Sequence, residues 1–187
     1  MQRMISVILK ENTKHLHDLV EARFNSGRIF EGTFTRQDYE NLLKYNYLFL
    51  LNFEKPVFDL ISEDNSQKMS LDKRVKLPLV KQDVQFMNIE TSKAIAFPEI
   101  KNEAEALGIL YVMEGSTLGG NMIAKQLSKL PDFKELSFVY FRCYGENTGS
   151  FWKNFKSVLD EAVTPDKYGD CTAGSVKAYQ FLLSLAN

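Results

Sequence analysis

Proline, cysteine and net charge are all scarce in this sequence, and each shortage argues against a class of protein. Five prolines and ten glycines among 187 residues leave long segments free to form regular secondary structure. The two cysteines, Cys143 and Cys171, have no metal-ligand spacing, so a reducing cytoplasmic setting is expected. A net charge of −1 gives no electrostatic argument for nucleic acid or for an anionic membrane as a partner.

Long apolar runs are also missing. No stretch of about 18 apolar residues is present, as a membrane-spanning helix would require, and the first residues turn polar too soon for a signal peptide. Hydrophobic residues make up 44% and charged residues 25%, the balance of an ordinary globular protein. We therefore expect one domain over residues 1–187, cytoplasmic, with neither membrane nor nucleic acid as a partner.

The periodicity of apolar residues is helical along most of the chain and predicts an all-α fold. Thr35 and Asp38 form a capping-box pattern, and Pro56 is expected to kink or divide the helix that follows. The β-prone residues 135–144 have no evident pairing partner and are expected to be extended or helical packing material. Helices are predicted at 2–23, 35–62, 70–89, 102–129, 150–163 and 172–186, with connections at 62–67, 97–102 and 143–150.

The predicted helix at 102–129 has an unusual number of glycines. Each interior glycine costs roughly 0.5–1 kcal/mol relative to alanine. At 100° per residue, Gly108, Gly115 and Gly119 share one stripe, with Gly120 next in sequence. The opposite face carries a predicted core stripe of Ala106, Ile109, Leu110 and Met113. A face without side chains permits either a close helix crossing or a flat ligand against the backbone, and the motif alone leaves both open.

The first predicted helix carries both histidines of the sequence, on opposite flanks of its apolar stripe. His17 shares its flank with Lys10, Thr13 and Glu21, whereas His15 is interpreted as a surface residue. A metal-ligating histidine commonly donates its second ring N–H to a carboxylate, which Glu21 could supply one turn away. A lysine two turns away could meet a negative group at a ligand's edge. The alternative is that His17 and its neighbours are ordinary solvated side chains.

The sequence lacks HExxH, ExxH pairs and Cys/His clusters, so a protein-only metal site has little support. A single histidine does suit haem, which brings its own equatorial ligands. "NTKHLHDLVE" resembles the proximal-helix signature T-x-x-x-H-x-x-x-E of the haem oxygenases, and "LYVMEGSTLGGNMI" resembles their glycine-rich distal helix in its bacterial form. "KRVKLPLVKQDVQFM" and "GSFWKNFKSVLDEAV" are similar to two further family stretches, in the same order.

The resemblance implies a multi-helical all-α domain that holds haem between a proximal and a distal helix. It implies that haem is both substrate and cofactor, and that the haem ring is opened to biliverdin with release of CO and ferrous iron. The reaction would consume O2 and electrons from an external donor such as a ferredoxin or a flavoprotein reductase. A bacterial phytochrome is the implied recipient of biliverdin. The implied site residues are His17 as axial ligand, Lys10, Thr13, Glu21, Gly120 and Lys153 in haem binding, and Gly115, Ser116 and Gly119 on the catalytic face.

One position departs from the animal members of the family. They carry an aspartate directly after the first distal glycine, where this sequence has Ser116. Serine can donate and accept hydrogen bonds but cannot carry the same charge. Two rival hypotheses remain at this stage: a haem-binding or haem-sensing protein without turnover, and a non-haem helical protein whose glycines only permit helix crossing.

Overall fold

The computed structural model describes residues 3–96 and 99–186, and the described residues contain helices and connections but no strand. The predicted all-α class is therefore confirmed. None of the described helices combines the length and apolar character needed to cross a membrane. The α-helices are α1 (Ile5–Arg23), α2 (Gly27–Glu31), α3 (Arg36–Leu60), α4 (Glu63–Met69), α5 (Leu77–Phe86), α6 (Glu103–Leu127), α7 (Thr148–Ala162) and α8 (Tyr168–Leu185). Short 3-10 helices are η1 (Leu71–Arg74), η2 (Pro131–Phe133), η3 (Gly145–Asn147) and η4 (Pro165–Lys167).

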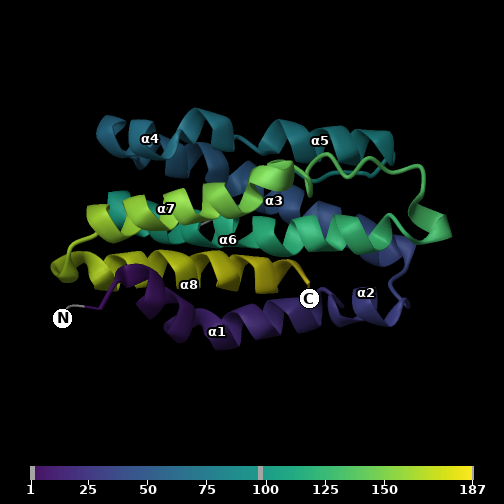
Figure 1. Cartoon of the computed structure of the whole chain (residues 1–187), viewed down its shortest axis with the longest axis horizontal. Helices are drawn as coiled ribbons and strands as arrows, with labels where there is room; N and C mark the ends of the chain where they lie inside the picture. The colour runs from purple at the N-terminus through teal and green to yellow at the C-terminus, as the bar shows by residue number, and fades with distance from the viewer. Residues whose placement is uncertain (1–2, 97–98, 187) are drawn as a thin grey trace.

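Helix α6 runs through the middle of the molecule and is the most buried element (Figure 1). It packs against α3, α7 and α8, while α1 lies beside α8 and α5 beside α3. The predicted core stripe of α6 is confirmed, because Ala106, Ile109, Leu110 and Met113 are all buried. The apolar stripe predicted for the first helix consists of Ile5, Ile8, Leu9, Leu16, Leu19 and Val20. It is wrong at Leu19, which is half exposed, whereas the other five are buried or pack partly buried against the core.

Helix starts follow local capping chemistry. The predicted capping box is present at α3: the Thr35 side chain accepts from the Asp38 N–H, and the Asp38 side chain accepts from the Thr35 N–H at 2.9 Å. At α6, the Asn102 side chain accepts from the Glu105 N–H at 3.0 Å. Pro56 does not divide α3, which continues to Leu60. Burial of Val57, the residue after the proline, shows that tertiary packing outweighs the local cost of the proline.

Two predicted boundaries are wrong. The predicted connection 62–67 is the start of α4, where the Ser62 N–H and hydroxyl both donate to Glu103 Oε1 at 2.8 Å and acidic residues occupy the first turn. The predicted single helix 70–89 is divided into η1 and α5. The buried Glu54 carboxylate accepts from the N–H groups of Lys76 and Leu77 and so stabilises a new helix start. The structure does not describe residue 2, where the first helix was predicted to start. It also does not describe residues 97–98 of the predicted connection 97–102.

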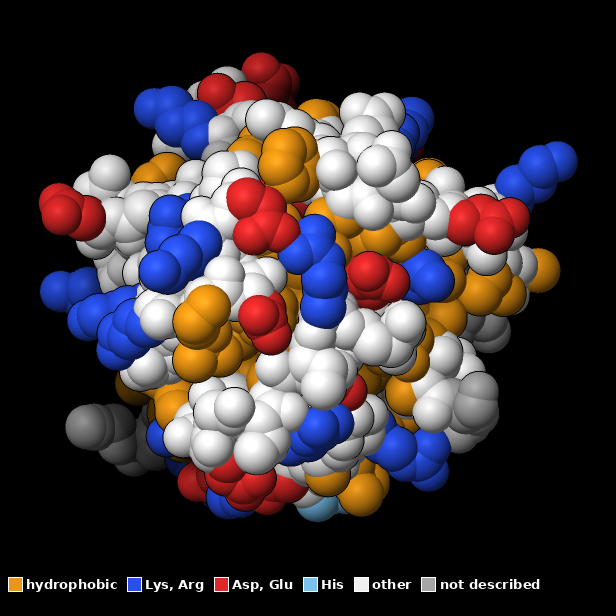
Figure 2. All heavy atoms as spheres, turned by 90° about the vertical axis from the view of Figure 1, so that its right-hand side faces the viewer, with side chains coloured by type: hydrophobic (Ala, Val, Ile, Leu, Met, Phe, Trp, Pro, Cys, Tyr) orange, Lys and Arg blue, Asp and Glu red, His pale blue; other side chains and the backbone are white. Residues whose placement is uncertain are grey.

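Residues 135–144 form no strand, as expected, but they are mostly turns rather than the extended or helical segment that the sequence predicted. Four of their aromatic side chains are buried, at Phe138, Tyr140, Phe141 and Tyr144. This segment, called the aromatic loop below, joins the short helix η2 to η3 and covers part of α6. On the end face of the molecule in Figure 2, positive and negative side chains are interspersed with apolar ones, consistent with the small net charge.

Candidate functional site

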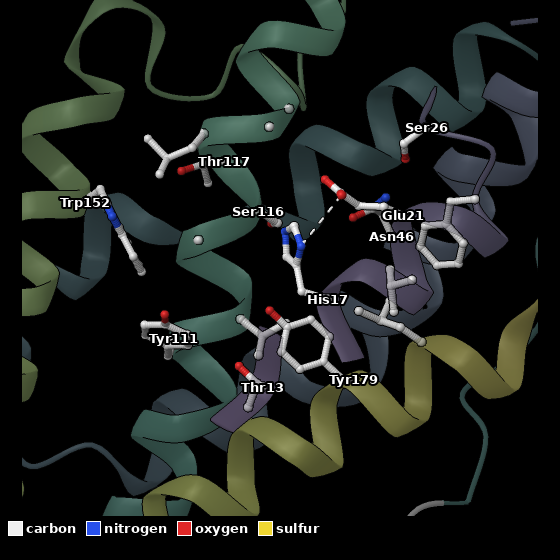
Figure 3. A pocket seen from close by; sticks show the side chains of 18 of the residues that line it. Thr13, His17, Glu21, Ser26, Asn46, Tyr111, Ser116, Thr117, Trp152 and Tyr179 are labelled. Carbon is white, nitrogen blue, oxygen red and sulfur yellow. Dashed lines mark ion pairs between the residues drawn. The ribbon is translucent and has the colours of Figure 1, made fainter. Parts of the chain in front are cut away.

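A cavity of about 760 Å³ lies between α1 and α6 (Figure 3). This volume falls within the range of small-molecule and cofactor sites. Helix α1 forms one wall and the glycine-rich part of α6 another, and α3, α7, α8 and the aromatic loop complete the lining. The two motifs that sequence analysis singled out, about 100 residues apart, therefore face the same space.

His17 lies on the α1 wall and is about half exposed to the cavity and solvent. Its Nδ1 is 3.8 Å from Glu21 Oε2, the pair marked in Figure 3, and 3.7 Å from Asp18 Oδ1. The ring meets Tyr179 of α8 edge-on, with 6.3 Å between centroids. Two carboxylates beside Nδ1 favour the proton on that nitrogen, which leaves Nε2 free to ligate a metal.

Thr13 and Lys10 lie on the same side of α1 and also line the cavity. Thr13 is buried and its hydroxyl donates to the Leu9 carbonyl at 2.7 Å. Lys10 is exposed at the edge of the cavity, where a second lysine of α1, Lys14, donates to Asp18 at 2.5 Å. The polar groups of this wall are thus arranged around His17, with lysines at the rim.

The glycines of α6 have two different roles. Gly108 faces α8, and a Cβ there would lie 1.9 Å from the Cys171 carbonyl oxygen; the equivalent atom on Gly174 of α8 would lie 2.0 Å from the Glu105 carbonyl oxygen. These two glycines let α6 and α8 cross closely, so at Gly108 the helix crossing, one of the two alternatives left open by the sequence, is the one observed. Gly115 and Gly119 do line the cavity, and a Cβ on Gly119 would meet nothing within 4 Å.

Gly120 also lines the cavity but is covered by the aromatic loop. A Cβ at this position would approach the Phe141 ring to 2.9 Å, so the absence of a side chain permits the loop to pack closely. Ser116, between these glycines, is exposed to the cavity and its hydroxyl donates to the Met113 carbonyl at 2.7 Å. Of the predicted residues on α6, Gly115, Ser116, Gly119 and Gly120 are therefore brought together on one wall.

Helix α7 contributes Trp152 and Lys156 to the cavity, and Lys153 is not among the lining residues. Lys153 is exposed. Trp152 and Lys156 are four residues apart, hence on one face of the helix, and the Lys156 ammonium lies 5.4 Å above the Trp152 ring. Lys153 is rotated by about 100° from Trp152, which directs it away from the cavity.

A buried charged cluster lies directly behind the glycine wall. Glu114 is fully buried and pairs with Arg74 and Lys76, both almost fully buried, while the Tyr144 hydroxyl donates to it at 2.9 Å. Arg74 also donates to the Asn154 side chain of α7 at 3.0 Å. The cluster therefore ties α6, α7, the start of α5 and the aromatic loop to one carboxylate. A lone acidic residue in the apolar run "LYVMEGST" was the available sequence signal.

Taken together, the site offers a slot with one histidine, a wall of exposed helix backbone opposite, aromatic edges and lysines at the rim. This arrangement suits a flat, apolar, metal-containing molecule that carries anionic groups at its edge.

Comparison with known proteins decides the assignment. The protein family described as "Heme oxygenase" matches residues 3–185. The chain belongs to the haem oxygenase family. A haem oxygenase from Xanthomonas campestris pv. campestris (strain 8004) is 28% identical over 131 residues, which cover 70% of this chain and 77% of the relative. Haem oxygenase activity and haem as the substrate follow from this membership.

Solved haem oxygenases share the fold. The structure from Neisseria meningitidis, determined with NO and CO bound, matches with a TM-score of 0.74 and 21% identity, covering 99% of this chain and 91% of the other. The haem oxygenase from Leptospira interrogans matches with a TM-score of 0.76 and 15% identity, covering 98% of each chain. Haem oxygenase 2 from Chlamydomonas reinhardtii, solved without haem, matches with a TM-score of 0.75 and 16% identity, covering 98% of this chain and 96% of the other.

Several residues that line the site of this haem oxygenase were missed at the sequence level. Asn46 of α3, Tyr140 and Cys143 of the aromatic loop, and Tyr179 of α8 all face the cavity. Burial raises the pKa of the Tyr140 and Tyr179 phenols and of the Cys143 thiol, so all three stay neutral at physiological pH. Their positions depend on how distant segments pack, and no local motif marks them.

Proposed function

We propose that this haem oxygenase binds its substrate between α1 and the Gly115–Gly120 segment of α6, with His17 as the axial ligand. The observation that supports this most directly is that His17 and the open glycines line one cavity from opposite helices. The donor set fits haem, because one imidazole faces the slot from α1, while the described residues that line it on the glycine wall include no His, Cys, Asp or Glu. Haem supplies the iron at which dioxygen is activated.

The residues around His17 would fix its ring. Glu21 and Asp18 lie on the Nδ1 side, and Tyr179 meets the ring at its edge, so rotation of the imidazole is restricted. Thr13 supports this wall from below by its bond to the Leu9 carbonyl and by an interaction with the Tyr179 hydroxyl. Partners beside a ligating histidine orient its ring toward the metal.

The lysines at the rim would meet the two propionates of haem. Lys10 lies on the α1 side and Lys156 on the α7 side, and both line the cavity. We assign the second contact to Lys156 rather than Lys153, because only Lys156 lies on the Trp152 face of α7. An ammonium group pairs with a carboxylate as a point charge and tolerates some movement of the ligand.

On the opposite wall, Gly115 and Gly119 would let the α6 backbone lie close to the ligand face of haem, and Ser116 would hydrogen-bond with water there. Close approach of the backbone restricts where a diatomic ligand can lie and leaves little room for bulk water. An external donor, such as a ferredoxin or a flavoprotein reductase, would supply electrons. Delivery of biliverdin to a phytochrome stays a prediction from the sequence resemblance.

The proposed binding mode is tested by titrating hemin into purified wild-type protein, His17→Ala and His15→Ala, and following the Soret band. His15 is exposed and does not line the cavity, so it is a matched control on the same helix. We expect wild type and His15→Ala to bind hemin alike, and His17→Ala to give a weaker complex with a shifted Soret band. Under air with a reductase system, the first two should form biliverdin. Unchanged spectra and turnover in His17→Ala would refute the assignment.

A further inference from the structure

The aromatic loop carries a backbone conformation that needs an explanation. Phe138 has φ of +54°, in the left-handed region that a bulky side chain rarely adopts. Such a residue costs on the order of 1–3 kcal/mol and persists only where its surroundings enforce it. Phe138 is buried, and its ring contacts Tyr39 edge-on at 5.5 Å between centroids. The strained residue turns the chain so that Tyr140, two positions later, reaches the cavity.

A buried carboxylate holds the loop in this position. Asp83 of α5 accepts from the N–H groups of Val139 at 3.1 Å and Tyr140 at 2.8 Å, and its side chain is almost inaccessible to solvent. Burying an acid is unfavourable, and the burial raises the pKa of Asp83. Two unfavourable features, the strained backbone of Phe138 and the buried carboxyl of Asp83, thus hold the backbone of Tyr140 in place.

The other end of Tyr140 is fixed as well. Its hydroxyl donates to Asn46 Oδ1 at 2.8 Å, and the Asn46 amide nitrogen donates to the Leu42 carbonyl at 2.8 Å. The second bond orients the amide so that its oxygen faces Tyr140. Tyr140 also interacts with the Ser116 hydroxyl on the glycine wall. Both Tyr140 and Asn46 line the cavity, so three segments bring polar groups together beside the open glycines.

This juxtaposition occurs beside Ser116 on the glycine wall. A serine hydroxyl is short, rotates freely and has already donated its proton to the Met113 carbonyl. A phenol held at its backbone and at its oxygen is a better fixed group, and preorganised hydrogen-bonding groups stabilise developing charge without reorganisation. Resting on the function proposed above, we propose that Tyr140, positioned by Asn46, is a further catalytic residue that orders water on the ligand face of haem.

In this role Tyr140 keeps its proton. Its oxygen accepts from water while its O–H donates to Asn46, and the protons consumed by the reaction come from solvent through that water. Asn46 acts through Tyr140 as a positioning residue. The alternative is that the pair only satisfies two buried polar groups, as most buried polar groups in proteins are satisfied.

Tyr144→Phe is the matched control, because Tyr144 belongs to the same loop and donates its hydroxyl to a buried partner but does not line the cavity. The hemin complexes of wild type, Tyr140→Phe, Asn46→Ala and Tyr144→Phe would be compared by hemin affinity, by the C–O stretching frequency of the ferrous CO complex, and by the rate of biliverdin formation. Urea unfolding of the haem-free proteins reports the purely structural cost.

We expect Tyr140→Phe to bind hemin within about twofold of wild type and to shift the C–O stretch. Biliverdin formation should slow about tenfold, because the phenylalanine can no longer hold the water in place, and single preorganised hydrogen-bonding groups contribute that much or more to rate. Asn46→Ala should shift the C–O stretch in the same direction by less. Tyr144→Phe should lose stability without shifting the stretch. Tyr140→Phe that matches wild type, or that matches Tyr144→Phe in every readout, would overturn the inference while leaving the proposed function intact. Wild-type protein without a Soret band would overturn both.

Discussion

Glu114 accepts a hydrogen bond from the Tyr144 hydroxyl at 2.9 Å in the core of the protein, one residue before the first open glycine of the cavity. Arg74 and Lys76 complete the cluster, so two cations and one anion are buried together. Such a group is favourable only while each member keeps its partners. The position of the glycine wall is therefore coupled to the ion pairs behind it.

Removal of the central carboxylate should destabilise the fold severely. Glu114→Ala leaves two buried cations without their partner, and we expect a loss of about 3–5 kcal/mol in the free energy of unfolding. Tyr144→Phe removes one hydrogen bond and should cost about 0.5–1.5 kcal/mol. Urea denaturation of the haem-free variants measures both. Equal losses for the two variants would show that the charges contribute little.

The two classes of glycine in α6 predict opposite effects of alanine. Gly108→Ala places a Cβ against the Cys171 carbonyl and should destabilise the protein by about 1–3 kcal/mol through overpacking. Gly119→Ala meets nothing within 4 Å and removes a helix-interior glycine, so it should stabilise the haem-free protein by about 0.5–1 kcal/mol. Thermal unfolding distinguishes them. Destabilisation by Gly119→Ala would mean that the structure leaves less space there than described.

A larger side chain on the glycine wall should separate substrate binding from turnover. We expect Gly115→Leu to retain most of the affinity for hemin but to lose most biliverdin formation, because the side chain occupies the space where O2 has to bind. Gly115→Ala, whose Cβ lies 3.5 Å from the Trp152 ring in ordinary contact, is the control. Parallel losses of binding and turnover in Gly115→Leu would contradict the close approach of backbone and ligand.

The lysines of α7 provide a direct comparison of the sequence with the structure. Lys156→Ala and Lys10→Ala should each weaken hemin binding about two- to fivefold, the range for a partly exposed ion pair. Lys153→Ala should leave the affinity unchanged, because this side chain is not part of the cavity lining. Hemin titration at low ionic strength measures all three. A larger effect at Lys153 than at Lys156 would favour the assignment made from the sequence.

The capping box of α3 predicts a pH dependence of stability. Burial acts to raise the pKa of Asp38, but hydrogen bonds from Thr35 and Asn25 and the charge of Arg28 outweigh it, so the net shift is downward. A lowered pKa in the folded state contributes stability that is present above the unfolded pKa of about 3.9 and is lost as pH falls through the folded pKa. Asp38→Asn should therefore cost about 1 kcal/mol at pH 7 and progressively less below pH 4. A constant difference across this pH range would exclude the linkage.

Sequence patterns predicted the parts of the fold that depend on local order. The Thr35 cap, the core face of α6 and five of the six predicted helices follow from periodicity and capping chemistry and are present, whereas the predicted helix 70–89 is divided. The division between η1 and α5 was not predictable, because it depends on the Glu54 carboxylate from a distant helix. Helix α4 likewise depends on Glu103, which accepts a hydrogen bond from the N–H of its N-cap residue Ser62.

The same distinction applies to the site. His17, Glu21, Gly115, Gly119 and Gly120 could be singled out from spacing on single helices, and the structure places them around one cavity. Tyr140 and Asn46 could not be singled out in this way, because their contact joins residues 94 positions apart in the sequence. The role of Gly108 could not be separated from that of Gly119 until α8 was in place.

The proposed function depends on His17 as the axial ligand beneath the glycine wall. Resonance Raman spectra of the ferrous hemin complexes of wild type, His15→Ala and His17→Ala test it most directly through the iron–imidazole stretching mode. We expect this mode to be present in wild type and His15→Ala, absent in His17→Ala, and restored when imidazole is added to His17→Ala. A mode that persists unchanged in His17→Ala without added imidazole would contradict it.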